Sequence, residues 1–172
     1  MNPDSEKMEP MEWAKFVIRN RNENGYSRAY NIFITNAREG DADAEYNLGL
    51  MYARGQGVPK DYDAALSWFQ KAHEKGHKGA MYFLGKMYAT GVGVQKDSRM
   101  AERLFLKCAD EDVRAQYEIG LLYFKNEDIP RNLDRSAKWM LRAANNGHVE
   151  AQFMIGQFYK AGAGVPKDVG KA

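Results

Sequence analysis

The hydrophobic positions of this chain recur in register, at spacings of 36, 35 and 36 residues. Each copy carries an aliphatic residue followed by glycine, and a tyrosine three positions later. The matching sets are Leu48-Gly49 with Tyr52, Leu84-Gly85 with Tyr88, Ile119-Gly120 with Tyr123, and Ile155-Gly156 with Tyr159. A fixed period of about 20–50 residues is typical of stacked-repeat architectures. The pattern predicts one domain built from repeats at 44–79, 80–114, 115–150 and, truncated, 151–172.

Each copy is expected to form two helices. In the first copy Ala44, Leu48 and Tyr52 recur every four residues, which places them on one helical face. The stretch GQGVPKD then ends the helix, because glycine permits the left-handed conformation and proline prevents continuation. Asp61 follows at the N-cap position of a second helix that stops at Gly76. First helices are expected at about 43–53, 80–89, 115–124 and 151–160, and second helices at about 62–76, 98–110 and 133–146, the last two capped by Asp97 and Asn132.

The glycines inside the first helices require a packing reason. A glycine in a helix interior costs about 1 kcal/mol relative to alanine, and four of them occupy the same position of the repeat. We expect the second helix to approach closely at this notch, with Trp68 or Phe69 entering it. The sequence leaves that choice open.

The two ends of the chain depart from the repeat. Residues 1–9 are expected to be disordered, and residues 10–43 to form a degenerate capping repeat, as is common at the ends of solenoids. In this repeat a helix starts at Pro10, and a second helix at about 26–39 buries Ala29, Ile32, Phe33 and Ala37. At the other end, the helix at 151–160 lacks its mate. Three expectations follow: a fragment of a longer solenoid, a disordered tail at 168–172, or docking of the exposed face, including a homodimer.

The consensus A-x-x-x-L-G-x-x-Y-x-x-G-x-G-V-x-x-D-x-x-x-A-x-x-W-x-x-K-A-x-x-x-G resembles the Sel-one-like repeat family, a relative of the tetratricopeptide repeats. It is nearly unbroken in Ala44–Gly76. The resemblance implies a right-handed α-solenoid of antiparallel helix pairs, whose first (A) helices line a concave surface. It also implies a protein-interaction adaptor, as in bacterial signalling, envelope and host-contact systems; toxin-neutralising immunity proteins are another known use. The subgroup with a disulfide in each repeat is excluded, because Cys108 is the single cysteine.

Composition narrows the function further. The 25 Lys and Arg residues are balanced by 23 Asp and Glu residues, and no basic run exceeds two residues. We therefore expect no nucleic-acid partner. No apolar run approaches the roughly 18 residues of a membrane span, and the polar N-terminus does not resemble a signal peptide. A cytoplasmic location is expected, or a periplasmic one if a leader was removed.

One stretch resembles a catalytic motif. His73, Glu74 and His77 form HExxH, which binds zinc when both histidines lie on one helical face. Gly76, however, is the expected helix terminator, so His77 should lie beyond the helix and the motif is fortuitous. Cys108 occupies an alanine position of the repeat and is expected to be a small buried side chain. We expect no catalytic residue, metal or cofactor; a zinc hydrolase is the alternative.

The candidate binding residues are those that the repeat does not fix. By analogy with tetratricopeptide packing, the concave surface should carry Tyr46, Asn47, Leu50, Arg54, Tyr82, Phe83, Lys86, Tyr117, Glu118, Leu121, Phe124 and Lys125. Aromatic anchors with cations nearby are typical of interface hot spots. The tyrosines could instead pack between adjacent A helices, whereas Phe83 and Phe124 favour an interface. The sequence thus predicts a non-enzymatic scaffold or adaptor that binds a protein or peptide; an immunity protein is the alternative.

Overall fold

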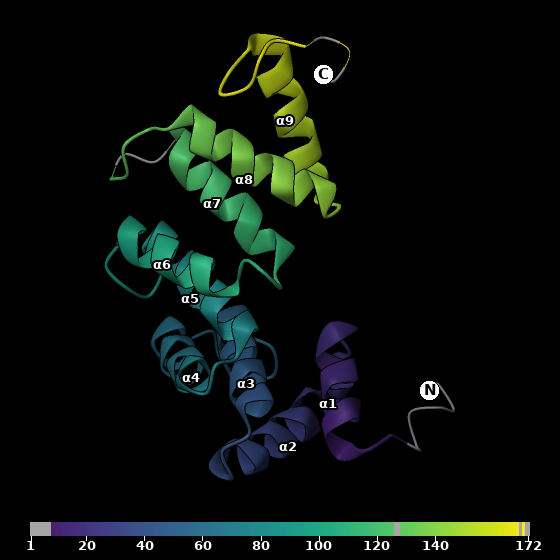
Figure 1. The fold of residues 1–172 in the computed structure, drawn as a ribbon. Coiled ribbons are helices and arrows are strands. Elements are labelled where there is room, and N and C mark those ends of the chain that lie inside the picture. The colour runs from purple at the N-terminus through teal and green to yellow at the C-terminus, as the bar shows by residue number, and fades with distance from the viewer. Residues whose placement is uncertain (1–7, 126–127, 169, 171–172) are drawn as a thin grey trace. The chain divides into compact units, whose positions relative to one another are not determined.

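The computed structural model describes residues 8–125, 128–168 and 170, and within these residues its regular secondary structure is helical throughout. Figure 1 shows the helices following one another along the chain as pairs joined by short loops. The predicted all-α fold of paired helices is confirmed. The expected disorder at 1–9 and at 168–172 falls largely on residues outside the described ranges.

The helix bounds lie close to the predicted ones. The helices are α1 (Pro10–Arg19), α2 (Tyr26–Arg38), α3 (Ala42–Arg54), α4 (Tyr62–Glu74), α5 (Lys78–Thr90), α6 (Ser98–Cys108), α7 (Val113–Lys125), α8 (Leu133–Asn145) and α9 (Val149–Ala161), with a short 3₁₀ helix at Glu23–Gly25. The A helices α3, α5, α7 and α9 begin one or two residues earlier than the apolar pattern predicted. The chain divides into two compact units, Met1–Ala80 and Met81–Ala172.

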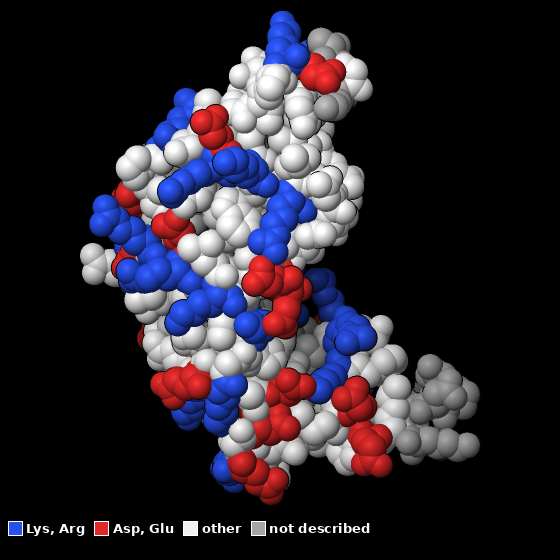
Figure 2. Space-filling view, in the orientation of Figure 1, with Lys and Arg blue, Asp and Glu red and all other residues white. Residues whose placement is uncertain are grey.

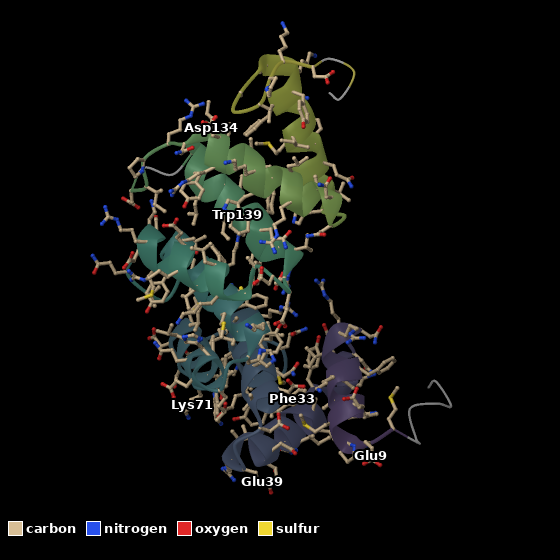
Figure 3. All side chains as sticks on the ribbon, in the orientation of Figure 1. Glu9, Phe33, Glu39, Lys71, Asp134 and Trp139 are labelled. Carbon is tan, nitrogen blue, oxygen red and sulfur yellow. The ribbon has the colours of Figure 1, made fainter. Side chains whose placement is uncertain are left out.

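The first unit is built on small and aromatic side chains from α1 to α4. Val17 of α1, Phe33 of α2 and Leu48 of α3 are each at most 1% exposed and belong to one cluster. Figure 3 shows Phe33 among α1, α2 and α3. Ile32, which was expected to be buried beside Phe33, is only partly buried and packs against the edge of this cluster. The degenerate first helix therefore contributes a full share of the core despite its lack of consensus residues.

In the second unit, too, buried side chains from successive helices pack together. Phe105 of α6 and Ile119 of α7 are buried in one cluster, and Met140 of α8 packs with Phe158 of α9 in another. Helices α7 and α8 form one antiparallel pair, and α8 packs in turn on α9 (Figure 1). The second unit thus builds its core from the apolar positions of the repeats, whereas the first unit also uses those of α1 and α2.

Three of the four glycine notches, at Gly49, Gly85 and Gly120, each receive a side chain from the following helix. A Cβ placed on Gly49 would lie 2.6 Å from Cδ1 of Phe69, and a Cβ on Gly85 would lie 2.5 Å from Cε1 of Phe105. These distances are far shorter than a van der Waals contact, so only glycine allows the helices to approach this closely. Phe69, not Trp68, is therefore the residue that enters the notch. Trp68 is partly buried beside it, and Lys71 lies over its ring at 4.2 Å.

The predicted N-caps of the second helices are confirmed. Asp61, Asp97 and Asn132 each accept a hydrogen bond from a backbone N–H in the first turn of α4, α6 and α8. The A helices have caps of their own, which the apolar pattern did not reveal. The residues at this equivalent position are Asp41, His77, Asp112 and His148, and each accepts a backbone N–H of the following helix. These caps explain why the A helices begin early, since a side-chain acceptor fixes the first turn.

Candidate functional site

A cleft of about 390 Å³ opens between α1 and α3 in the first unit. It is lined by Lys15, Ile18, Arg19, Asp43, Tyr46, Asn47, Leu50, Arg54 and His77. Four of the predicted binding residues, Tyr46, Asn47, Leu50 and Arg54, are therefore brought together. The wall from α1 was missed, because α1 lacks the consensus by which the other A helices were aligned. We call this space the first cleft.

Some charged side chains of the first cleft form ion pairs and others do not. Nζ of Lys15 lies 2.6 Å from Oδ2 of Asp43. The hydrogen bond between them lowers the pKa of Asp43 and raises the pKa of Lys15. Arg19 and Arg54, by contrast, are exposed at the rim, and among the described residues no carboxylate forms an ion pair with either. The cleft thus offers two guanidinium groups that the fold itself does not use.

His77 is part of the lining of the first cleft. Its Nδ1 accepts the backbone N–H of Ala80 at 3.1 Å, and its Nε2 lies 3.2 Å from Oδ1 of Asp43. The imidazole stacks on the ring of Tyr46, with centroids 4.3 Å apart. Burial lowers the pKa of His77 below its usual 6.5, although the Asp43 carboxylate acts in the opposite direction. A neutral imidazole also suits the cap, because only an unprotonated Nδ1 can accept a hydrogen bond.

We expect the ring protons of His77 to titrate in the folded protein with a midpoint below 6.5, as NMR can measure. Because the folded protein binds this proton less readily than the unfolded chain, the free energy of unfolding should fall as pH drops from about 6.5 toward the lowered midpoint. Asp43→Asn should lower the midpoint further by removing the opposing charge, and the neighbouring Lys15 stays charged throughout this range. A midpoint above 6.5, or one raised by Asp43→Asn, would contradict this account.

A second cleft, of about 380 Å³, opens between α5 and α7 in the second unit. Its lining consists of Lys86, Ala89, Thr90, Lys96, Glu118, Leu121, Leu122 and Lys125. Four further predicted binding residues, Lys86, Glu118, Leu121 and Lys125, are brought together here. Nζ of Lys86 lies 2.7 Å from Oε1 of Glu118, and Lys96 lies 3.3 Å from Asp128. The exposed Lys125 stands at the rim.

The tyrosine row is engaged in packing inside each unit. The guanidinium carbon of Arg114 lies 4.2 Å from the centroid of the Tyr82 ring. Burial raises the pKa of the Tyr82 hydroxyl to about 12. Tyr117 stacks on His148 with centroids 4.4 Å apart. With the stack of Tyr46 on His77, each tyrosine of the row thus contacts a residue at the start of the following A helix. Of the two alternatives that the sequence left open, packing accounts for one face of each ring.

The two phenylalanines that favoured an interface lie outside both clefts. Phe83 meets the ring of Tyr82 edge-on at 5.3 Å, and Phe124 packs on Phe158 of α9 at 5.3 Å. Both are partly buried. Their role in partner binding stays a prediction, and so does docking through α9, which exposes Val149 and Phe153 by 71% and 67%.

The HExxH stretch does not form the geometry that zinc binding requires. Helix α4 ends at Glu74, and Gly76 has a φ of +84°, so His77 lies past the helix end. As predicted, His73 and His77 therefore do not lie one turn apart on a common helix.

Cys108 is 1% exposed, which confirms its expected place in an alanine position. None of the described helices combines the length and the hydrophobicity of a membrane-spanning segment.

Solved structures with the same fold include two bacterial proteins. A protective antigen of uropathogenic Escherichia coli, described as displaying an SLR fold, superposes with a TM-score of 0.82 at 28% identity, over 94% of this chain and 38% of its own. A Sel1 repeat protein from Oxalobacter formigenes superposes with a TM-score of 0.74 at 33% identity, over 85% of this chain and 42% of its own. These similarities confirm the expected class of fold, an α-solenoid of helix pairs.

Curated relatives occur in animals. The proteins named DAP3-binding cell death enhancer 1 from Mus musculus and Rattus norvegicus are each 31% identical to this chain over 150 residues. The match covers 86% of this chain and 29% of each relative, so the chain spans less than a third of their length. The Sel1 repeat itself is matched at residues 42–77, 79–113, 113–148 and 149–172. With its repeats matched over most of its length, the chain belongs to the Sel1 repeat family.

Proposed function

We propose that this chain is a non-enzymatic interaction module that binds a segment of a partner protein along its A helices. Members of the Sel1 repeat family commonly serve as scaffolds for protein–protein interaction. The observation that carries the proposal is the pair of clefts, which gather eight of the twelve predicted binding residues in two groups. A host-contact setting has support from one solved relative, a protective antigen of uropathogenic Escherichia coli, and the animal relatives show that similar sequences are not confined to bacteria.

The clefts lie at positions that the repeat does not fix. Where the first full repeat has Leu50, the next three copies have Lys86, Leu121 and Gln157. A position that serves only the fold would be filled alike in each copy, as the notch glycines are. The variation is instead what a binding surface requires, because specificity depends on side chains outside the shared scaffold.

A truncation in the second cleft tests the proposal. A partner is first captured with the intact chain and identified by mass spectrometry, and its dissociation constant is then measured by calorimetry. Leu121→Ala should weaken binding about tenfold, since an anchoring side chain contributes more than about 1 kcal/mol. Leu106→Ala is the matched control, because Leu106 is 45% exposed on α6, away from both clefts. Equal affinity of the two variants would overturn binding along the A helices.

A further inference from the structure

The two clefts are copies of one arrangement, offset by 71 residues, or two repeats. Three lining residues correspond at this offset: Lys15 to Lys86, Leu50 to Leu121, and Arg54 to Lys125. In each cleft the lysine of the earlier A helix forms an ion pair with a carboxylate of the later one, at 2.6 Å to Asp43 and at 2.7 Å to Glu118.

The same offset relates contacts outside the clefts. The stack of Tyr46 on His77 returns as the stack of Tyr117 on His148. The ion pair in which Lys75 lies 2.6 Å from Glu45 returns, without charge, as the hydrogen bond that Asn146 donates to Gln116. These contacts therefore recur after two repeats, as the two clefts do.

Each cleft has an excess of positive charge. The first holds Lys15, Arg19 and Arg54 against Asp43, and His77 is held toward its neutral form. The second holds three lysines, Lys86, Lys96 and Lys125, with Glu118 in the lining and Asp128 beside Lys96. The whole chain has a net charge of only +2, and Figure 2 shows acidic side chains interspersed with basic ones over the face in view. Each cleft thus holds more cations than carboxylates, although the charges of the whole chain are nearly balanced.

Apolar side chains also line both clefts, and in the first they offer only a narrow surface, since Ile18 is 3% and Leu50 is 6% exposed. Ile18 and Leu50 line the first cleft, and Leu121, Leu122 and Ala89 line the second. A guanidinium group binds a carboxylate through two parallel hydrogen bonds, whereas an apolar wall favours an aliphatic side chain. Cations at the rim over an apolar wall therefore complement a carboxylate next to an aliphatic residue.

We propose that each cleft binds an acidic segment of a partner protein, in which carboxylates alternate with aliphatic side chains. The carboxylates contact Arg19 and Arg54 in the first cleft and Lys125 in the second, and the aliphatic side chains rest on Leu50 and Leu121. This inference rests on the proposed function and adds the chemistry of the partner. A glutamate side chain and a C-terminal carboxylate supply the same group, and the test separates them.

Synthetic peptides of about ten residues provide the test, with binding to the full chain followed by fluorescence anisotropy of a fluorescein label. The first peptide combines glutamate, leucine and serine and has an amidated C-terminus. In the second, lysine replaces glutamate. In the third, glutamine replaces glutamate and the C-terminal carboxylate is free. The first should bind and the second should not; binding of the third at equal strength would assign the cleft to a C-terminal carboxylate instead of acidic side chains.

Charge reversals connect this binding to the clefts. Arg54→Glu should weaken binding at the first cleft about tenfold, and Lys125→Glu should do the same at the second. Each single variant should therefore keep one site of unchanged affinity, and the double variant should keep neither. The matched controls are Arg38→Glu on α2 and Lys138→Glu on α8, which change the charge equally at exposed positions outside the clefts. Circular dichroism checks that all four variants remain folded. Raising the salt concentration to about 1 M should also weaken binding, because exposed charges are then screened.

Several outcomes would overturn the inference. These are no binding of either carboxylate peptide, equal loss in the cleft and control variants, or stronger binding of a single-stranded oligonucleotide than of the glutamate peptide. Suppose that Leu121→Ala weakens binding of the captured partner but Arg54→Glu and Lys125→Glu do not. Binding along the A helices would then stand, and the proposal that the bound segment is acidic would be wrong. If neither kind of variant affects the partner, both proposals fail.

Discussion

Phe69→Ala is expected to lower the free energy of unfolding by about 3–5 kcal/mol, the range for deleting a large side chain from a packed core. Phe69 is 1% exposed, and its ring fills the notch at Gly49. Removing the ring leaves a cavity that cannot collapse easily, because Gly49 has no side chain to move into it. Urea unfolding followed by circular dichroism measures the change, and a loss below about 1 kcal/mol would contradict the packing described here.

A double-mutant cycle sharpens this test. Gly49→Ala alone should destabilise the protein by about 1–3 kcal/mol, because its Cβ would lie 2.6 Å from the Phe69 ring. In the Phe69→Ala background the same Cβ enters an empty space. Gly49→Ala should then be neutral or stabilising, since alanine favours a helix by about 1 kcal/mol over glycine. An equal cost in both backgrounds would show that the glycine is needed for another reason.

Gly57→Ala is expected to destabilise the protein by about 3–4 kcal/mol. Gly57 has a φ of +74°, and its Cβ would lie 2.5 Å from Cβ of Tyr26 and 3.3 Å from the Tyr26 carbonyl carbon. The left-handed conformation alone costs an alanine about 1–2 kcal/mol, and overpacking adds about 1–3 kcal/mol. Tyr26 cannot move aside freely, because it is buried at the start of α2 and its hydroxyl accepts a hydrogen bond from Gln56.

The neighbouring glycine of the same loop provides the control. Gly55 has a similar φ of +68°, but the nearest atom to its Cβ would be Cβ of Lys60 at 3.4 Å. Gly55→Ala should therefore cost only the conformational part, about 1–2 kcal/mol. Thermal unfolding of the two variants side by side separates backbone strain from crowding. Similar melting temperatures for both would mean that the loop does not dock on Tyr26 as the structure has it.

The sequence predicted the parts of the fold that depend on local chemistry. Helix ends followed from glycine, proline and capping side chains, and the caps Asp61, Asp97 and Asn132 were correctly placed. The caps of the A helices were missed in part because histidine is not among the usual capping residues, although His77 and His148 both accept a backbone N–H.

The choice between adjacent aromatic residues could not be made from periodicity. Trp68 and Phe69 are neighbours in sequence, and a helical face is wide enough to accept either. The structure buries Phe69 and leaves Trp68 partly exposed, with the ammonium group of Lys71 over an indole that the core does not enclose.

The candidate site was predicted by position and completed by the structure. Leu50 and Arg54, like Leu121 and Lys125, were identified because the repeats vary there. The opposite walls depend on which helices lie side by side: Lys15 and Arg19 come from α1, which shows no consensus by which to align it. Lys96 was also missed, because it belongs to a loop and not to an A helix.

The two-repeat period has a consequence for how this chain can be lengthened or shortened. Lysine and leucine alternate at one position of the first four A helices, as Lys15, Leu50, Lys86 and Leu121, and the fifth has Gln157. If one of these repeats were deleted, two A helices with the same residue at this position, leucine or lysine, could follow each other along the chain. Deleting or inserting a block of 71 residues would preserve the alternation. An array of this kind can therefore be lengthened by blocks of two repeats without losing the alternation of lysine and leucine.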